Sequence, residues 1–386
     1  MVDELAIATR DNLRSHLDAT PYDWLILGVP QHVAYVTGYR SVAGDIFASH
    51  RMAALVNADS VVVVAPVADG GALLDHVDGD HHEPYGRFYF EGDHPVAGFA
   101  DRHGSFAAAL EAAARRFGVS GRIGIDTAID QSEQTRLGSL PGIDEVDESA
   151  DAWLRRVRSI KLPGEVALLE AAARLAENGI DAALSVAAPG VTERELVAVV
   201  AATMVEGGGL PRFLVVTSGE RSAFSDARGT DRQLRPGDLV RFDVGCTVDG
   251  YWSDVGRTAI VEAPDALTSQ RYAAIAAGEE AQLEMIRPGV SAEELFRTAV
   301  ETVERGGLRP YRRHHCGHGI GTEVYEPPIV AAGVETLLEP GMVLCLETPF
   351  YEIGWGGMMV EDAVELTPTG ARRLTHSDRS LRVIGQ

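Results

Sequence analysis

Apolar runs alternate with amphipathic stretches along the whole chain, and the pattern changes near residue 152. Over 1–152 the pattern predicts an amphipathic N-terminal helix, strands over WLILGV and AALVNADSVVVVAP, a helix over 105–117 and a strand over RIGID. This succession of helices and strands indicates an α/β unit. From residue 158 a helix runs to about Ala188, and the apolar, β-branched-rich runs VRFDV, MVLCLE and MMVEDAVEL follow, which are typical of buried strands.

A polar segment, DGDHHEPYGRFYFEGDHP, interrupts the first part of the chain. Its histidines lack a regular ligand spacing, so a solvent-exposed loop is expected there rather than a metal site. These histidines are His81, His82 and His94. The segment also holds four aromatic residues, which are candidates for contact with a partner subunit: Tyr85, Phe88, Tyr89 and Phe90.

An internal repeat occupies the second part. PGVTERELV, starting at Pro189, recurs as PGVSAEELF from Pro288, and LRPGDLVRFDVG recurs as LEPGMVLCLETP. In the first pair Thr192 and Ser291 are each followed three residues later by Glu, which is a capping box that opens a helix. Two matches in the same order predict two similar α+β halves about a pseudo-twofold axis.

Carboxylates occur within or beside the predicted strands of these halves, where an unpaired charge is costly. Together with one histidine they form a set of five candidate ligands: Asp243 in RFDVG, Asp254 in WSDVG, His318 in HHCGHGIG, Glu347 in CLETP and Glu361 in MMVED. Hard oxygen ligands with one imidazole suit Mn, Co, Fe or Zn, and four carboxylates are enough to bridge and neutralise two such ions. The sequence therefore predicts a dinuclear hydrolytic centre.

With these ligands and their spacing, the chain resembles the metallopeptidases with the pita-bread fold, in the Xaa-Pro aminopeptidase, prolidase and creatinase branch. The segments that carry the resemblance are VPQHVAYVTGYR, RSIKLPGEVALLEAAARLAENGIDAAL and TSGERSAFSDARGTDRQLRPGDLVRFDVG. The resemblance covers nearly the whole chain. It implies a creatinase/prolidase-like α/β domain over 1–152, an α+β pita-bread catalytic domain over 158–386, and a homodimer.

The resemblance also implies a role for each ligand. Asp254 and Glu361 would bridge the ions, Asp243 would complete one, and His318 with Glu347 would complete the other. A water between two cations is acidified while the metals polarise the scissile carbonyl. Glu347 would accept and pass on the proton of that water.

Residues on the substrate side depart from the peptidase pattern. Asp226 and Tyr325 stand where the resemblance implies histidines, and Met359 stands where it implies an arginine. Tyr325 would still donate to the developing oxyanion, and His314 would shape the pocket. Losing a donor at 226 and a permanent cation at 359 favours a substrate that is neutral or positively charged on that side. We therefore expect weak turnover of Xaa-Pro dipeptides and better activity on a cyclic or cationic amide.

Three function classes remain open at this point. The first is a metal-dependent peptidase acting on a small peptide. The second is a hydrolase of a small non-peptide amide, like creatinase or ectoine hydrolase. The third is a non-catalytic binding module, which the retention of all five candidate ligands disfavours.

Composition narrows the partners. The chain has 34 Lys and Arg against 57 Asp and Glu, a formal net charge of −23, which disfavours nucleic acid and anionic membranes. No apolar run approaches the roughly 20 residues that cross a bilayer, and the N-terminus lacks a signal-peptide pattern, so a cytoplasmic location is expected. Cys246, Cys316 and Cys345 lie close to candidate ligands, but their apolar neighbours favour buried packing residues.

Overall fold

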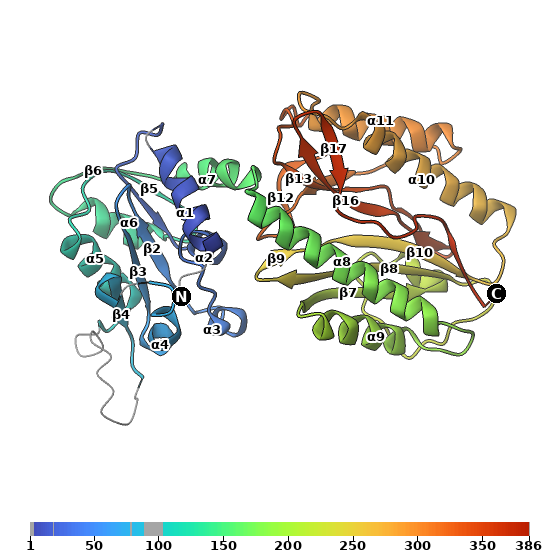
Figure 1. Cartoon of the computed structure of the whole chain (residues 1–386), viewed down its shortest axis with the longest axis horizontal. Helices are drawn as coiled ribbons and strands as arrows, with labels where there is room; N and C mark the ends of the chain where they lie inside the picture. Colours follow the sequence, from blue (N-terminus) through green and yellow to red (C-terminus); the bar gives the residue numbers. More distant parts are fainter. Residues whose placement is uncertain (1–3, 18, 78, 89–102, 386) are drawn as a thin grey trace. The chain divides into compact units, whose positions relative to one another are not determined.

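The computed structural model of the chain describes residues 4–17, 19–77, 79–88 and 103–385 (Figure 1). Two compact units divide the chain, Met1–Val157 and Arg158–Gln386. The predicted end of the first domain, residue 152, lies inside helix α7 (Ala150–Ser159). Tyr89, Phe90 and His94 lie outside the described residues.

The N-terminal unit is built on a sheet with the strand order β4-β3-β2-β1-β5-β6. Its strands are β1 (Trp24–Leu27), β2 (Ala53–Val56), β3 (Val61–Pro66), β4 (His82–Tyr85), β5 (Gly121–Ile125) and β6 (Ile143–Asp147). Its longer helices are α1 (Glu4–Leu17), α2 (Pro30–Thr37), α5 (Phe106–Arg116), α6 (Gln131–Gly138) and α7. The short helices are α3 (Val42–Ile46), η1 (Val67–Asp69), α4 (Gly70–Leu73) and η2 (Gly79–His81).

Both faces of this sheet are buried. Successive residues of a strand point to opposite sides, and those of β1 pack against helices on each side. Leu25 and Leu27 of β1 pack in a cluster with residues of α1, α2 and α7. Trp24 and Ile26 pack in a second cluster with residues of α5 and α6. The sheet is therefore a central layer with helices on both faces.

Two expectations for this unit are wrong. The run AALVNADSVVVVAP is a hairpin of β2 and β3 rather than one strand, because the Asn57 side chain accepts hydrogen bonds from the backbone N–H groups of Asp59 and Ser60 and so closes a turn. The polar segment is not all exposed loop. His82 is buried at the start of β4, which pairs in parallel with β3.

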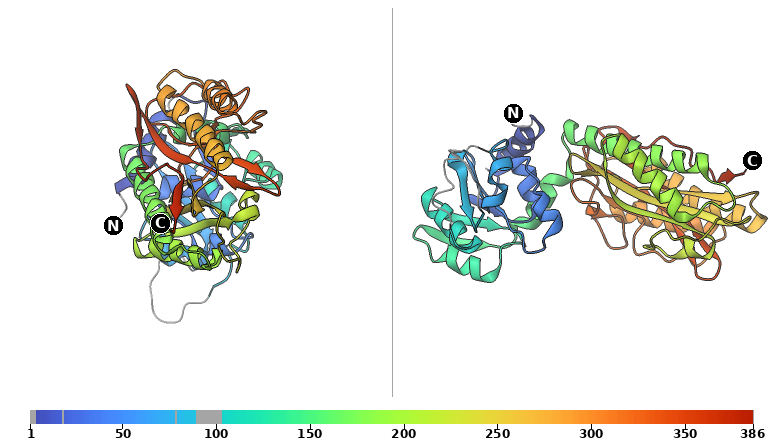
Figure 2. Two further views of the ribbon diagram at one scale, coloured as in Figure 1. Left: turned by 90° about the vertical axis from the view of Figure 1, so that its right-hand side faces the viewer. Right: turned by 90° about the horizontal axis from the view of Figure 1, so that it is seen from below.

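The C-terminal unit carries a larger sheet with the order β12-β11-β13-β16-β10-β8-β7 (Figures 1 and 2). These strands are β7 (Leu210–Ser218), β8 (Leu239–Val248), β10 (Val255–Val261), β11 (Gly317–Gly319), β12 (Glu326–Ile329), β13 (Val343–Glu347) and β16 (Glu361–Thr367). Shorter strands pair at its margins, β9 (Tyr251–Trp252), β17 (Gly370–Arg373) and β18 (Arg382–Ile384), while β14 (Phe350–Glu352) pairs with β15 (Gly356–Met358).

Two helix pairs pack against this sheet. They are α8 (Pro163–Val186) with α9 (Glu193–Glu206), and α10 (Ala266–Met285) with α11 (Ala292–Arg305); a short helix, η3 (Gly219–Ala223), follows β7. One core cluster joins α8 and α9 to β8 and β10. A second joins α10 and α11 to residues of β8, β10 and β15, and a third joins them to β13 and β16.

The repeat in the sequence appears as repeated hydrogen bonding. Capping boxes open α9 at Thr192 and α11 at Ser291. The two capping residues pair with Gln233 and Leu337, respectively. In each half, the start of the helix therefore pairs with the segment that leads through a Pro-Gly turn into a strand, β8 or β13. The two halves bring these strands to corresponding places.

Candidate metal centre

Three of the predicted ligands stand in one row across the large sheet. Asp243 of β8 pairs with Gly256 of β10, which also pairs with Glu361 of β16. Glu361 pairs in turn with Glu347 of β13. Residues directly opposite each other on antiparallel strands project to the same face. The three carboxylates therefore share one face, and Gly256 places no side chain between the first two.

The other two candidates reach this face through the two-residue period of a strand. Asp254 lies two residues before Gly256, and His318 pairs with the residue two positions before Glu347. Ligand atoms of Asp254, His318 and Glu361 all lie within 4.8 Å of one another. Nε2 of His318 is 3.6 Å from Oδ2 of Asp254.

Two buried atoms at this point fit a bound cation. Nδ1 of His318 lies 3.0 Å from the carbonyl oxygen of Gly319, which fixes Nε2 toward the carboxylates. His318 Nε2 and Asp254 Oδ1 have no hydrogen-bond partner within the part of the chain that the structure describes. Buried polar atoms are costly without a partner, and an imidazole nitrogen with carboxylate oxygens suits a divalent transition-metal ion.

The electrostatics support the same interpretation. Burial raises the pKa of Asp243 to about 7, and it also raises the pKa of Asp254. The pKa of Glu361 lies well above its usual range because of burial and the nearby charges of Asp254 and Glu347. Divalent cations would allow these carboxylates to ionise together.

Glu347 differs because cationic groups surround it. Burial works to raise its pKa, but a hydrogen bond from His315 and the charge of Arg313 leave it below the usual value. Nδ1 of His315 is 3.0 Å from Oε1 of Glu347, and Nη2 of Arg313 is 3.6 Å from Oε2. The predicted pocket residue His314 is exposed and stacks edge-on against His315 at 4.3 Å. Thus the histidine that contacts Glu347 is His315, and the pocket role expected for His314 stays a prediction.

A second missed residue lies beside Met359. Met359 is buried, and its sulfur lies 3.5 Å from Nη1 of Arg241. The same Nη1 donates to Oδ2 of Asp243 at 2.8 Å. The expectation that Met359 leaves this side of the centre without a permanent cation is therefore wrong, because Arg241 supplies one from β8.

The two remaining substrate-side candidates are both accessible. Tyr325 is 47% exposed, and its ring stacks on His318 with the centroids 3.8 Å apart. Partial burial, with the negative charges of Glu347 and Glu361 nearby, raises the pKa of Tyr325 well above the usual value, so the phenol keeps its proton and can donate. Asp226 is exposed and accepts a hydrogen bond from the hydroxyl of Ser225.

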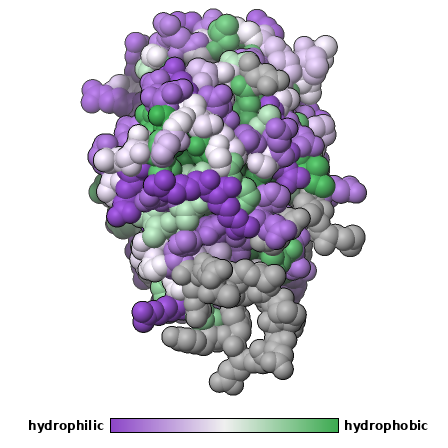
Figure 3. All heavy atoms as spheres, turned by 90° about the vertical axis from the view of Figure 1, so that its left-hand side faces the viewer, coloured by the Kyte–Doolittle hydropathy of each residue, from purple (hydrophilic) through white to green (hydrophobic). Residues whose placement is uncertain are grey.

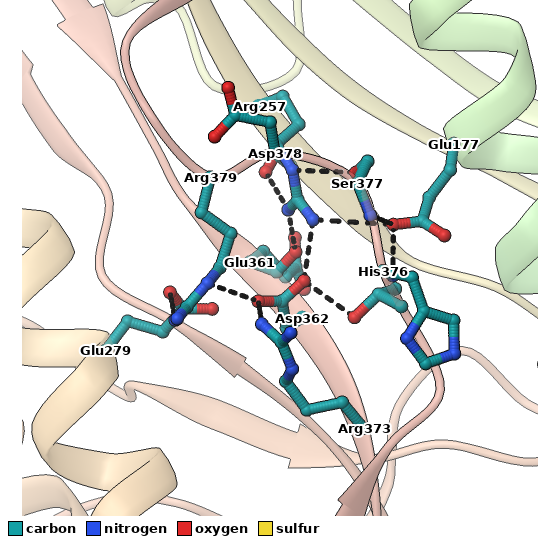
Figure 4. A network of polar contacts seen from close by, with 12 residues as sticks. Glu177, Arg257, Glu279, Glu361, Asp362, Arg373, His376, Ser377, Asp378 and Arg379 are labelled. Atoms are coloured by element: carbon teal, nitrogen blue, oxygen red, sulfur yellow. Dashed lines mark hydrogen bonds and ion pairs between the residues drawn. The ribbon is translucent and has the colours of Figure 1, made fainter.

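The opposite face of the ligand strands carries a buried network of charges (Figure 4). Arg257 donates to the carbonyl oxygen of Glu361 and, at 2.7 Å, to Oδ1 of Asp362. Asp362 also accepts from the hydroxyl of Thr375. Because Arg257 follows Gly256 and Asp362 follows Glu361, this network holds the backbone of two residues in the ligand row.

A sheet that brings four acids and one histidine to one face, in a unit built from two similar halves, defines a metal-dependent hydrolase with the pita-bread fold. Residues 167–368 match the model of metallopeptidase family M24. The chain belongs to this family.

Individual relatives agree with this assignment. An Xaa-Pro dipeptidase of Pyrococcus furiosus is 32% identical over 68% of this chain and 74% of its own length. A probable dipeptidase, PepE, of Mycobacterium tuberculosis is 35% identical over 64% of this chain and 65% of its own length. The solved prolidase from Pyrococcus furiosus superposes with a TM-score of 0.77 at 25% identity, over 95% of this chain and 100% of that one.

The comparisons confirm the predicted fold, the family and a peptide-cleaving, metal-dependent enzyme. They do not assign roles to single residues, so the ligand and substrate roles stay predictions. The three cysteines are buried, as expected from their apolar neighbours. Among the described residues no helix is both long and apolar enough to span a membrane.

Proposed function

We propose that this chain is a dinuclear metallopeptidase that cleaves dipeptides, with Xaa-Pro dipeptides as the first class to test. The observation that carries the proposal is the row of Asp243, Glu361 and Glu347 across one sheet face. Nε2 of His318 is aimed into it and has no hydrogen-bond partner among the described residues. Two divalent ions bound there would acidify a water and polarise the scissile carbonyl. Manganese is the first ion to test, although the ligand set also suits Co, Fe and Zn.

Within this proposal the chain's own residues have distinct tasks. Asp254 and Glu361 would bridge the ions, Asp243 would complete one, and His318 with Glu347 the other. The contacts with His315 and Arg313 hold the pKa of Glu347 below its usual value, so this carboxylate is ionised, the form that can accept a proton.

Tyr325 would donate a hydrogen bond from the mouth of the site to the oxygen on which charge develops. Its position on the ring of His318 holds the phenol beside a proposed ligand, while its partial exposure leaves it accessible to a substrate. His314, exposed next to His315, would line the same mouth.

The charge around the site supports a substrate with an anionic end. The guanidinium groups of Arg241 and Arg313 lie 5.2 and 5.8 Å from the ring centroid of Tyr351, and each also contacts a candidate ligand. Arg241 has its donors occupied, whereas Arg313 lies 3.6 Å from Glu347 and can turn a donor toward a carboxylate. We therefore favour a free dipeptide over the cationic amide that Met359 alone would suggest.

The homodimer also remains a proposal, and its support has changed. Tyr85 packs inside its own unit, donating to the carbonyl oxygen of Arg51 and contacting Phe106 edge-on. Phe88 of the same segment is 46% exposed, and three neighbouring apolar residues on and after α3, Val42, Ile46 and Phe47, are 75%, 66% and 59% exposed. On the face that Figure 3 shows, hydrophilic residues predominate and apolar ones are scattered among them. A second copy covering α3 would bury this group, and light scattering at micromolar concentration should then report twice the chain mass.

The substrate experiment is a panel of dipeptides assayed with Mn, Co and Zn: Xaa-Pro, Xaa-Ala, their C-terminal amides, and small cyclic and cationic amides. The proposal expects the free dipeptides to be cleaved and amidation of the C-terminus to lower kcat/KM. The variant Asp254→Asn should abolish cleavage, while Glu206→Gln, an exposed acid on α9, should leave it unchanged. Cleavage of the cyclic or cationic amides alone would favour the non-peptide alternative.

The cytoplasmic location expected from the sequence stays a prediction.

A further inference from the structure

Arg241 is a fully buried arginine on β8, two residues before Asp243. A guanidinium group in the interior is costly unless its donors are paired. The five N–H groups of this side chain each face an acceptor within the protein, so no donor of this arginine is available to bind a substrate.

The acceptors fall into two sets on opposite sides of the guanidinium. On one side Nε donates to the carbonyl oxygen of Ser222 at 3.0 Å, and Nη2 donates to those of Phe224 and Ser225 at 2.8 and 2.7 Å. On the other side Nη1 donates to Oδ2 of Asp243 at 2.8 Å and lies 3.5 Å from the Met359 sulfur. One side chain therefore fixes both a proposed metal ligand and three carbonyls of one chain segment.

That segment leads directly to the substrate side of the site. Phe224, Ser225 and Asp226 are exposed, and Asp226 follows the last carbonyl that Arg241 binds. An exposed segment whose backbone carbonyls converge on one buried guanidinium depends on that group for its conformation. The orientation of Asp226 is thus linked to the carboxylate of Asp243.

The strand register explains how position 241 reaches Met359. Arg241 pairs with Thr258 of β10, and the hydroxyl of Thr258 hydrogen-bonds the backbone of Met359 at 2.8 and 2.9 Å. Arg241 and Met359 therefore flank Thr258 as Asp243 and Glu361 flank Gly256. A guanidinium group entering from either position would lie beside the same ligands.

We propose that Arg241 is a positioning residue that couples the metal ligand Asp243 to the segment Ser222–Asp226, and so sets metal affinity and substrate binding together. The proposal rests on the proposed function, because it assumes that Asp243 is a metal ligand. Arg241 touches neither the substrate nor the reacting atoms. It acts through Asp243 on one side and through the segment on the other.

The test compares Arg241→Met, Arg241→Lys and the double variant Arg241→Met/Met359→Arg in the full chain. Binding of Mn²⁺ to chelator-treated protein is measured by calorimetry, and kcat and KM are measured on the best peptide of the panel. Arg241→Met should weaken one of the two Mn²⁺ sites about 10- to 100-fold, the usual cost of losing a residue that orients a ligand, and should raise KM. Arg241→Lys should fall between, since an ammonium group has three donors for five acceptors.

The double variant separates positioning from general stability. A guanidinium group from position 359 can reach Asp243, so Mn²⁺ affinity should recover. It does not replace the hydrogen bonds to the carbonyl groups of Ser222, Phe224 and Ser225, so KM should stay raised. Wild-type Mn²⁺ affinity and KM in Arg241→Met would overturn the proposal, as would a double variant that recovers neither. If Arg241→Met does not fold, the same two readouts on Arg241→Lys decide, with unchanged values overturning the proposal. Failure of the wild-type chain to bind Mn²⁺ would instead overturn the proposed function.

Discussion

Asp243 and Glu361 lie on either side of one glycine, Gly256, in the same row of the large sheet. This relationship brings together two carboxylates that are more than a hundred residues apart in sequence. It arises because β10 is the strand between β8 and β16. The space above the glycine is filled by the side chain of Met359, not by a side chain of β10.

The first prediction concerns that space. A Cβ atom added at Gly256 would lie 2.5 Å from Cε, 2.8 Å from Cγ and 2.9 Å from Sδ of Met359. Because the methionine end is flexible, Gly256→Ala should fold but push Met359 toward the ligands, lowering kcat/KM and the bound metal per chain, the former about tenfold. The double variant Gly256→Ala/Met359→Ala, which removes the clash, should regain most of the activity. An unchanged metal content and rate in the single variant would contradict this prediction.

The second prediction separates the two adjacent histidines. His315→Ala should lower kcat/KM about 10- to 100-fold, because it removes the group that contacts Glu347. His315→Asn should recover part of the loss, since an amide can donate from a similar place. His314→Ala, at the exposed neighbour, removes no contact to Glu347 and should lower kcat/KM less than His315→Ala does. Equal losses in the two alanine variants would show that His315 has no special position.

The third prediction is a pH dependence of stability that does not involve the metal ligands. Glu326 of β12 is buried between Lys161, whose Nζ is 2.7 Å away, and Arg158. Burial works to raise its pKa, but these two cations hold it at about 2, below the usual value of 4.5. A depressed pKa in the folded state stabilises the fold above about pH 4.5, and that contribution, about 3 kcal/mol, is lost as the pH falls toward 2.

Urea unfolding of Glu326→Gln measures this contribution. At pH 7 the variant should be less stable by about 3–5 kcal/mol, because two buried cations lose their partner. It should also lose less stability than the wild type between pH 4.5 and 3. Glu323→Gln is the control, because Glu323 pairs with the same Arg158 at 3.1 Å but is 20% exposed, and its loss should stay below about 1 kcal/mol. Parallel pH curves for the wild type and Glu326→Gln would refute the prediction.

The fourth prediction uses the repeat. Thr192→Ala and Ser291→Ala each remove the capping hydroxyl at the start of a corresponding helix, α9 or α11. Each should lower the free energy of unfolding by about 1 kcal/mol, and by similar amounts, since both halves use the same capping box. Ser185→Ala, at an exposed hydroxyl within α8, should change it by less than about 0.5 kcal/mol. A large effect in only one half would show that the halves are not equivalent.

The sequence was sufficient to predict the two-part organisation and the repeat, and it placed the five candidate ligands in or beside buried strands, although their role as ligands stays a prediction. Thr192 and Ser291 each begin a four-residue capping box that predicts the start of a helix. The candidate acids lie within or beside apolar strand segments, where an unpaired charge is costly. The hairpin at Asn57 was missed because strand propensity was read across a turn that one side chain closes.

The remaining site residues depend on register and backbone path, which spacing does not give. His314 and His315 are adjacent, and nothing local shows which of them turns toward Glu347 in a segment that forms no helix or strand. In the sequence Arg241 has no feature that sets it apart from other strand residues. Only the strand pairing through Thr258 shows that it lies beside Met359. From the sequence, the methionine at position 359 therefore indicated that the site had lost a positive charge. In the fold, Arg241 on β8 supplies that charge.

The most direct test of the metal centre is the metal content of the chain, measured by mass spectrometry after incubation with Mn²⁺ and removal of free ions by gel filtration. Two ions per wild-type chain are predicted, with a clear loss in His318→Ala, whose Nε2 has no protein partner among the described residues. Fewer than one ion per wild-type chain, or the same content in His318→Ala, would contradict the dinuclear centre.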